Sequence, residues 1–124
     1  MNQDTLLLRQ INPGFVQNGR VTSQAFRPTP KDENLLSVYD GDLISPEESY
    51  EHFVGQPNCR SVGVQAVSLS ECTSLELDTR PDPEPFPEHA VIDFSNLSSN
   101  QINKKAKRLQ RKAQDRGWLH QADQ

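Results

Sequence analysis

Four side chains of the kinds that bind zinc are spread through the middle of the chain: His52, Cys59, Cys72 and His89. Zinc sites that can be recognised from sequence usually contain ligand pairs separated by about two to four residues. The separations here are 7, 13 and 17 residues. We therefore predict no metal site, and no motif indicates a cofactor. Each cysteine is expected to be a free, buried thiol, because two cysteines are too few for a disulfide framework.

A second group of polar residues lies in segments with the pattern of strands. Arg9 interrupts an apolar run near the start of the chain, and Ser23 lies in the middle of the alternating segment 20–26. A charged side chain that is buried in such a run needs a partner. Two interpretations stay open. Arg9 forms a structural ion pair with Asp40 or Glu71, or Arg9 and Ser23 line a pocket for an anionic or nucleotide ligand.

The order of these residues is similar to that of ADP-ribosyltransferase-type, NAD-consuming domains, which have an arginine on the first strand, a Ser/Thr strand next and an acidic residue later. The chain also resembles RES-type toxins in one series of residues, namely Leu8-Arg9, Pro13, Gly19-Arg20, and Ser37-Val38-Tyr39 before a Ser-Pro helix start. This resemblance implies that Arg9 holds a pyrophosphate, that Tyr39 stacks on nicotinamide, and that Glu71 or Glu76 orients a ribose. The candidate catalytic residues of this hypothesis are Arg9, Ser23, Tyr39 and Glu71.

Charge is divided unevenly between the two ends of the chain. Residues 99–124 contain seven Lys or Arg and two acidic residues, which give a net charge of +5. Residues 1–98 contain six Lys or Arg and fifteen acidic residues, a net charge of −9. The two parts together give the total charge of −4. Such asymmetry indicates a charged partner for one end, or docking of one end onto the other.

The basic end has the strongest helix signals in the sequence. Ser98 can cap the helix with Gln101 three residues later, and Gly117 can end it. At helical spacing an apolar stripe contains Ile102, Ala106, Leu109 and Ala113. The opposite face contains Lys104, Lys107, Arg108, Arg111 and Lys112. Like charges four residues apart repel one another by a few tenths of a kcal/mol per pair, so this face gains from a negative surface nearby.

We predict that these five basic residues form a partner-binding surface. Four surroundings could neutralise or solvate these charges: nucleic-acid phosphates, an acidic protein, the acidic body of the same chain, or bulk water. The first functional hypothesis is therefore a small cytosolic binding or adaptor module that uses its basic helix to contact an acidic protein surface or nucleic acid. The second is the small NAD- or nucleotide-handling enzyme described above.

Apolar periodicity and turn residues predict the elements that position these groups. The expected helices cover 46–54, which Ser45 can cap with Glu48 three residues later, and 97–118. Residues 81–87, with proline at every second position, are expected to be an extended connector. Strands are expected at 5–11, 20–26, 35–39, 61–69 (with a bulge near Val67), 74–77 and 90–94. The predicted fold is a small α+β domain with a mostly antiparallel mixed sheet, one short helix and a long basic helix, in which residues 1–97 form an acidic body and 98–124 pack on it.

Composition narrows the class of protein further. The chain of 124 residues is 33% apolar, which is low for a globular domain but compatible with a modest core. It contains no apolar run of the roughly 18 residues that a membrane span needs, and its start lacks the pattern of a signal peptide. We expect a cytoplasmic protein of bacterial type that does not bind membranes.

Overall fold

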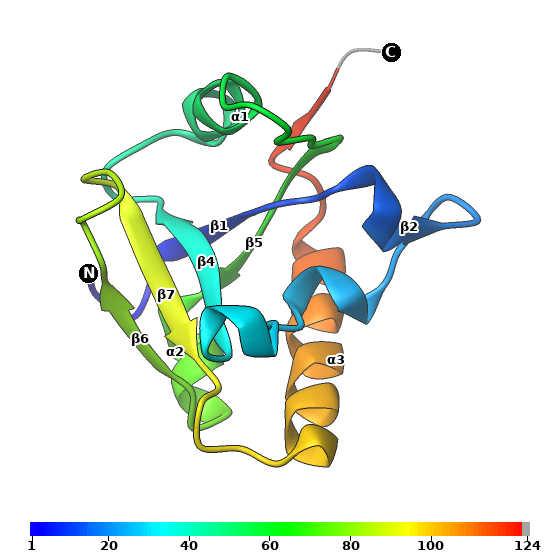
Figure 1. Cartoon of the computed structure of the whole chain (residues 1–124), viewed down its shortest axis with the longest axis vertical. Coiled ribbons are helices and arrows are strands. Elements are labelled where there is room, and N and C mark those ends of the chain that lie inside the picture. Colours follow the sequence, from blue (N-terminus) through cyan, green and yellow to red (C-terminus); the bar gives the residue numbers. More distant parts are fainter. Residues whose placement is uncertain (123–124) are drawn as a thin grey trace.

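The computed structural model describes residues 1–122, which form one α+β domain (Figure 1). A six-stranded sheet has the order β6-β7-β4-β1-β5-β8, and every pairing in it is antiparallel. The strands are β1 (Leu6–Gln10), β4 (Leu35–Asp40), β5 (Gly63–Ser68), β6 (Asp78–Pro81), β7 (His89–Asp93) and β8 (His120–Gln121), and a separate ribbon contains β2 (Val16–Gln17) and β3 (Arg20–Val21). The helices are α1 (Pro46–Val54), α2 (Leu69–Ser74) and α3 (Ser99–Arg116), with 3-10 turns η1 (Pro13–Phe15), η2 (Ser23–Phe26) and η3 (Pro30–Asp32).

The two faces of the sheet carry separate apolar clusters. The long helix α3 and η2 cover one face, where Leu7, Val38 and Ile92 of the strands are buried in one cluster with Leu109 of α3. The short helix α1 covers part of the other face, where Leu8 and other strand residues pack against Phe53. Neighbouring leucines of β1 therefore belong to different clusters, as the alternation of side chains along a strand requires.

Both predicted helix starts are confirmed. In α1 and in α3 the capping serine, Ser45 or Ser98, accepts from the backbone N–H three residues later, and the side chain at that later position accepts from the serine N–H. Gly117 ends α3 with a φ of 88°, and its N–H donates to the Ala113 carbonyl. This value lies in the left-handed region that glycine adopts without strain.

Two predicted strands are wrong. Residues 20–26 form only the short β3, and the chain then turns into η2, because a 3-10 turn buries the consecutive residues Ala25 and Phe26, which a strand would point in opposite directions. Residues 74–77 contain no strand. Ser74 is the last residue of α2, which begins with a capping box of Ser68 and Glu71, and β6 begins only at Asp78.

The predicted bulge in β5 is also absent. The pairing of β1 with β5 runs without interruption from Leu6 opposite Ser68 to Gln10 opposite Val64. Every residue of β5 is buried. Because both faces of this interior strand are covered, its apolar residues do not need to alternate. Among residues 1–122 there is no helix of the length and apolarity that a membrane crossing demands.

Candidate functional site

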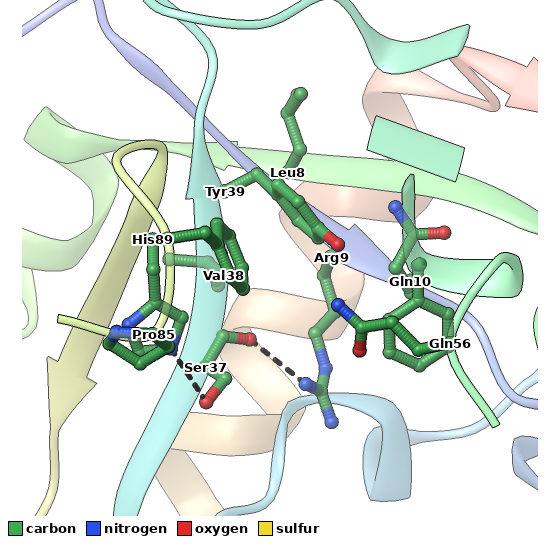
Figure 2. A pocket seen from close by; sticks show the side chains of 11 residues that line it. Leu8, Arg9, Gln10, Ser37, Val38, Tyr39, Gln56, Pro85 and His89 are labelled. Carbon is green, nitrogen blue, oxygen red and sulfur yellow. Dashed lines mark hydrogen bonds between the residues drawn. The ribbon is translucent and has the colours of Figure 1, made fainter. Parts of the chain in front are cut away.

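The sheet contains a place where two neighbouring strands stop pairing. All five residues of β1 pair with β5, but only Leu7 and Leu8 pair with β4, opposite Asp40 and Tyr39. The rest of β4 pairs on its other side with β7. A pocket of about 330 Å³ lies at this fork between β1 and β4 (Figure 2), and we call it the fork pocket. Its lining consists of Leu8, Arg9, Gln10, Ser37, Val38, Tyr39, Phe53, Gln56, Pro85, Phe86 and His89.

Arg9 uses its guanidinium to bridge the fork. Its Nε donates to the Ala25 carbonyl at 2.7 Å, its Nη1 donates to the Ser37 carbonyl at 2.9 Å, and the group lies 5.7 Å from the centre of the Phe15 ring. The expected ion pair with Asp40 or Glu71 is therefore wrong. The reason is that backbone carbonyls near the fork accept the hydrogen bonds that a carboxylate would have accepted.

The same guanidinium keeps donors for a ligand. An arginine has five N–H donors, and the two hydrogen bonds above are those that Arg9 makes within residues 1–122. Burial lowers the pKa of Arg9 to about 10, an effect that the nearby charge of Asp32 partly opposes. The group is still a cation at neutral pH. The pocket thus contains a half-buried positive charge whose remaining N–H groups can bind an anion.

Aromatic rings form one wall of the pocket. The Phe86 ring lies 5.0 Å from Tyr39, 4.6 Å from His52 and 5.2 Å from His89, measured between ring centres. The Tyr39 hydroxyl is 2.8 Å from Nδ1 of His52. Burial raises the pKa of Tyr39 to about 12, with smaller contributions from Cys59 and Glu88, so the phenol stays neutral. This wall presents flat apolar surface on which a planar group can stack.

A hydroxyl and an imidazole meet next to this aromatic wall. Ser37 Oγ lies 3.1 Å from Nε2 of His89, and Figure 2 marks this contact with a dashed line. Nδ1 of the same ring lies 2.8 Å from the Asp82 carbonyl oxygen and 3.4 Å from the Asp82 carboxylate. From the sequence, His89 is one of four zinc-type side chains whose spacing predicts no metal site, and Ser37 has no role of its own. No sequence signal joins these two residues, which are 52 positions apart.

The structure brings together two of the four predicted catalytic residues. Arg9 and Tyr39 line the fork pocket, whereas Ser23 and Glu71 do not. Ser23 begins η2, which contacts Arg9 through the backbone of Ala25 instead. The serine that lines the pocket with Arg9 is therefore Ser37 and not Ser23.

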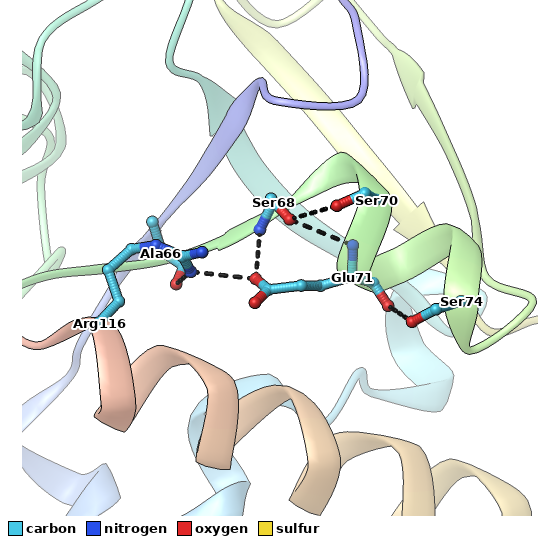
Figure 3. A network of polar contacts seen from close by, with 6 residues as sticks. All are labelled: Ala66, Ser68, Ser70, Glu71, Ser74 and Arg116. Carbon is cyan, nitrogen blue, oxygen red and sulfur yellow. Dashed lines mark hydrogen bonds and ion pairs between the residues drawn. The ribbon is translucent and has the colours of Figure 1, made fainter.

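Glu71 belongs to a polar network that ties α2 to α3 (Figure 3). Arg116 donates from Nη1 to the Ala66 carbonyl at 2.9 Å and to Glu71 at 3.0 Å, and Glu71 also accepts from the Ser68 N–H at 2.7 Å. Burial opposes ionisation of Glu71, but these hydrogen bonds and the charge of Arg116 outweigh it and hold the pKa of Glu71 below its usual value. We assign this network to stability, because it lies outside the fork pocket.

The predicted partner-binding residues of α3 are all exposed: Lys104, Lys107, Arg108, Arg111 and Lys112. Within residues 1–122 none of these five forms an ion pair, so the acidic body does not cover this face. The other two basic residues of α3 point elsewhere. Lys105 donates to the Leu75 carbonyl, and Arg116 belongs to the network described above.

The four candidate zinc ligands have separate surroundings. His52 contacts Tyr39, His89 contacts Ser37, Cys59 lies 3.6 Å from the Gln56 side-chain oxygen, and Cys72 is in the core. Burial raises the pKa of Cys72 to about 11. In the part of the chain that the structure describes, no three His, Cys, Asp or Glu side chains are grouped so that they could hold a metal ion.

Comparison of this chain with protein-family models, with curated proteins and with solved structures finds no match.

Proposed function

We propose that the fork pocket binds a small ligand that has a planar ring and an anionic group, as nucleotides have. One observation carries this proposal. The half-buried guanidinium of Arg9, with donors to spare, lies in the same pocket as the rings of Tyr39 and Phe86. The volume of about 330 Å³ is near the lower end of ligand pockets, which range from roughly 300 to 1,000 Å³. It suits a single ring with its anion better than a complete dinucleotide.

Each part of this ligand matches a physical property of the lining. A guanidinium binds phosphate or carboxylate through parallel N–H donors, and partial burial strengthens that interaction by lowering the local dielectric constant. Aromatic faces favour stacked or tilted rings. Arg9 and Tyr39 are also the two residues to which the ADP-ribosyltransferase-like order gives the pyrophosphate and the nicotinamide. A small NAD- or nucleotide-handling enzyme is the finer form of this proposal.

The test is direct titration with AMP, ADP and NAD⁺, measured by calorimetry and by the shift of the melting temperature. We expect saturable binding of at least one of these ligands. Arg9→Gln should weaken it at least tenfold, because a charge-assisted bidentate contact is lost. Phe86→Ala should weaken it less, because one stacking surface is lost.

The matched control is Arg27→Gln, which removes the same charge from an exposed position next to η2. It should bind the ligand as the wild type does. No binding of any of the three ligands at millimolar concentration, or equal loss in Arg27→Gln and Arg9→Gln, would contradict the proposal.

A second function is favoured by the uncovered basic face of α3. Five exposed cations on one helix lack intramolecular acidic partners among the described residues, so an external polyanion, either an acidic protein surface or nucleic acid, would relieve their repulsion. Titration with RNA, DNA and an acidic polypeptide at two salt concentrations tests this idea. If nucleic acid binds there, Lys107→Ala combined with Arg111→Ala should lower both the affinity and its dependence on salt.

The control for that experiment removes two cations elsewhere, at the exposed residues Arg27 and Lys31. Both double variants change the net charge equally. An equal loss of affinity in both would show that total charge, and not the α3 face, controls binding.

A further inference from the structure

We infer that Ser37 is a nucleophile and His89 its general base, and that Ser37 Oγ attacks the carbonyl carbon of a small ester held in the fork pocket. This inference rests on the proposal that the fork pocket is a ligand site, but not on the identity of the ligand. Its foundation is the chain of contacts from Ser37 Oγ through the His89 ring to Asp82, with distances of 3.1 Å and 2.8 Å at the two ring nitrogens.

The neighbours of His89 determine where its proton lies. Nδ1 faces the carbonyl oxygen and the carboxylate of Asp82, and both of these oxygens can only accept hydrogen bonds. The neutral ring therefore carries its proton on Nδ1, and Nε2 presents a lone pair to the Ser37 hydroxyl. This tautomer is the one that a general base needs to take a proton from serine.

Backbone pairing holds the three residues in place. Tyr39 of β4 lies opposite His89 of β7, and Ser37 lies opposite Val91. Ser37 and His89 are therefore diagonal neighbours on the same face of the sheet, at a distance that side chains can bridge. Asp82 is fixed as well, because its N–H donates to the His89 carbonyl at 2.9 Å. His89 as a whole residue is 8% exposed, so its ring is closely packed, whereas Ser37 is exposed to the pocket.

The pocket also supplies a donor for the charge that forms during attack. The Nη1 of Arg9 already reaches the backbone carbonyl of Ser37, so the cation lies beside the nucleophilic residue. Positioned N–H donors of this kind stabilise the oxyanion of a tetrahedral intermediate. The apolar residues Leu8, Phe53 and Phe86 favour an ester with an apolar or aromatic acyl group.

The reaction is balanced by the groups described and by water. The Ser37 Oγ–carbon bond forms while the serine proton moves to Nε2 of His89, and the carbonyl π electrons move to the oxygen. When the tetrahedral intermediate collapses, the carbon–alkoxy bond breaks and the leaving alcohol takes the proton from His89. Water then attacks the acyl-serine with His89 as base again, and the products are a carboxylic acid and an alcohol.

An alkyl fluorophosphonate probe tests the nucleophile without knowledge of the substrate. Attack by Ser37 forms an oxygen–phosphorus bond and expels fluoride, and intact mass spectrometry detects the adduct. We expect one adduct, which peptide mapping places on Ser37. Ser37→Ala should remove it, and His89→Gln should slow labelling at least tenfold. Circular dichroism checks that both variants are folded.

Two further variants separate chemistry from structure. Ser95→Ala is the matched control, because Ser95 is exposed just beyond the opposite end of β7 from His89 and should leave labelling unchanged. Asp82, which is 44% exposed at its side chain, acts as a positioning residue. Asp82→Asn should slow labelling several-fold, and Asp82→Glu should restore part of the rate, which a purely structural role would not explain.

The outcomes distinguish this inference from the proposed function. Labelling at Ser37 that depends on His89 supports the nucleophile, even if nucleotides do not bind. Absence of an adduct in a protein that binds nucleotides overturns the nucleophile and leaves the ligand site standing. Labelling of Ser37 at the wild-type rate in His89→Gln overturns the role of the base.

Discussion

The helix α3 and the fork pocket differ in where their polar side chains lie relative to the sheet. In α3 the residues that face the sheet are apolar, and Ile102, Ala106, Leu109 and Ala113 are all buried. The five cations of its outer face, in contrast, are exposed to solvent. In the fork pocket a cation, a hydroxyl and an imidazole lie where two strands stop pairing. One region therefore stabilises the fold with apolar contacts, whereas the other places polar groups at a gap in the sheet.

The largest effect should come from the apolar side of this comparison. Leu109 is 0% exposed, so Leu109→Ala should lower the free energy of unfolding by about 2–5 kcal/mol through lost contacts and the cavity left behind. Urea denaturation measures the change. Lys107→Ala, on the exposed face of the same helix, is the control. A loss below about 1 kcal/mol would show that α3 contributes little to the core, since such burial costs more to lose.

An intermediate effect is expected at the fork. Arg9→Gln removes the donors that satisfy the carbonyls of Ala25 and Ser37, and unsatisfied polar groups cost about 1–3 kcal/mol. The same urea denaturation measures it, with Arg27→Gln as the control for charge. If Arg9→Gln were as stable as the wild type, Arg9 would contribute nothing to the stability of the fold. The fork pocket would then differ from α3 more strongly than we expect.

A smaller effect is expected where α2 meets α3. Glu71→Gln keeps a side-chain acceptor for the Ser68 N–H but loses the charge that faces Arg116. We expect a loss of about 1 kcal/mol or less at pH 7, because partly exposed ion pairs contribute little.

The dependence on pH follows from the lowered pKa of Glu71 in the folded protein. A carboxylate of this kind stabilises the fold above its unfolded pKa of about 4.3, and that contribution disappears as the pH falls through the lower folded value. The difference between wild type and Glu71→Gln should therefore be constant above about pH 5 and shrink below about pH 4. Glu84→Gln, at an exposed position, is the matched control for the change of charge. A gap that stayed constant at low pH would contradict the ion-pair assignment.

The smallest effect is expected on the outer face of α3. Lys107→Ala combined with Arg111→Ala should change the free energy of unfolding by less than about 0.5 kcal/mol, because both residues are exposed. Relief of their repulsion adds only a few tenths of a kcal/mol. A clear loss of stability in urea would mean that these side chains have structural partners, and the division of α3 into a packing face and a free face would be wrong.

The sequence predicted the parts of the fold whose signals are local. The capping serines Ser45 and Ser98 and the glycine at 117 fixed the ends of α1 and α3 within a few residues. The strands β1, β4, β5 and β7 followed from their apolar runs. The helix α2 was missed, although Ser68 and Glu71 form the same kind of cap, because this helix follows β5 without a turn.

The candidate site was only partly predictable, because it depends on strand register. Arg9 stood out as a charge in an apolar run, and Tyr39 through a family resemblance. The approach of Ser37 to His89 requires the pairing of β4 with β7, and the pocket exists because β1 leaves β4 after two residue pairs. Neither the register of β4 with β7 nor the separation of β1 from β4 can be predicted from the spacing of residues along the chain.

The central position of β1 also has a consequence for biosynthesis. This strand lies between β4 and β5, so the ribosome makes it before either of its neighbours. Until β4 and β5 are made, the leucines of β1 lie in an unpaired apolar segment of the nascent chain. Exposed apolar segments of this kind tend to aggregate. Arg9 interrupts that segment with a charge, as gatekeeper residues do in other exposed apolar strands. We therefore expect the side chain that bridges the fork in the folded protein to limit aggregation of the newly made chain as well.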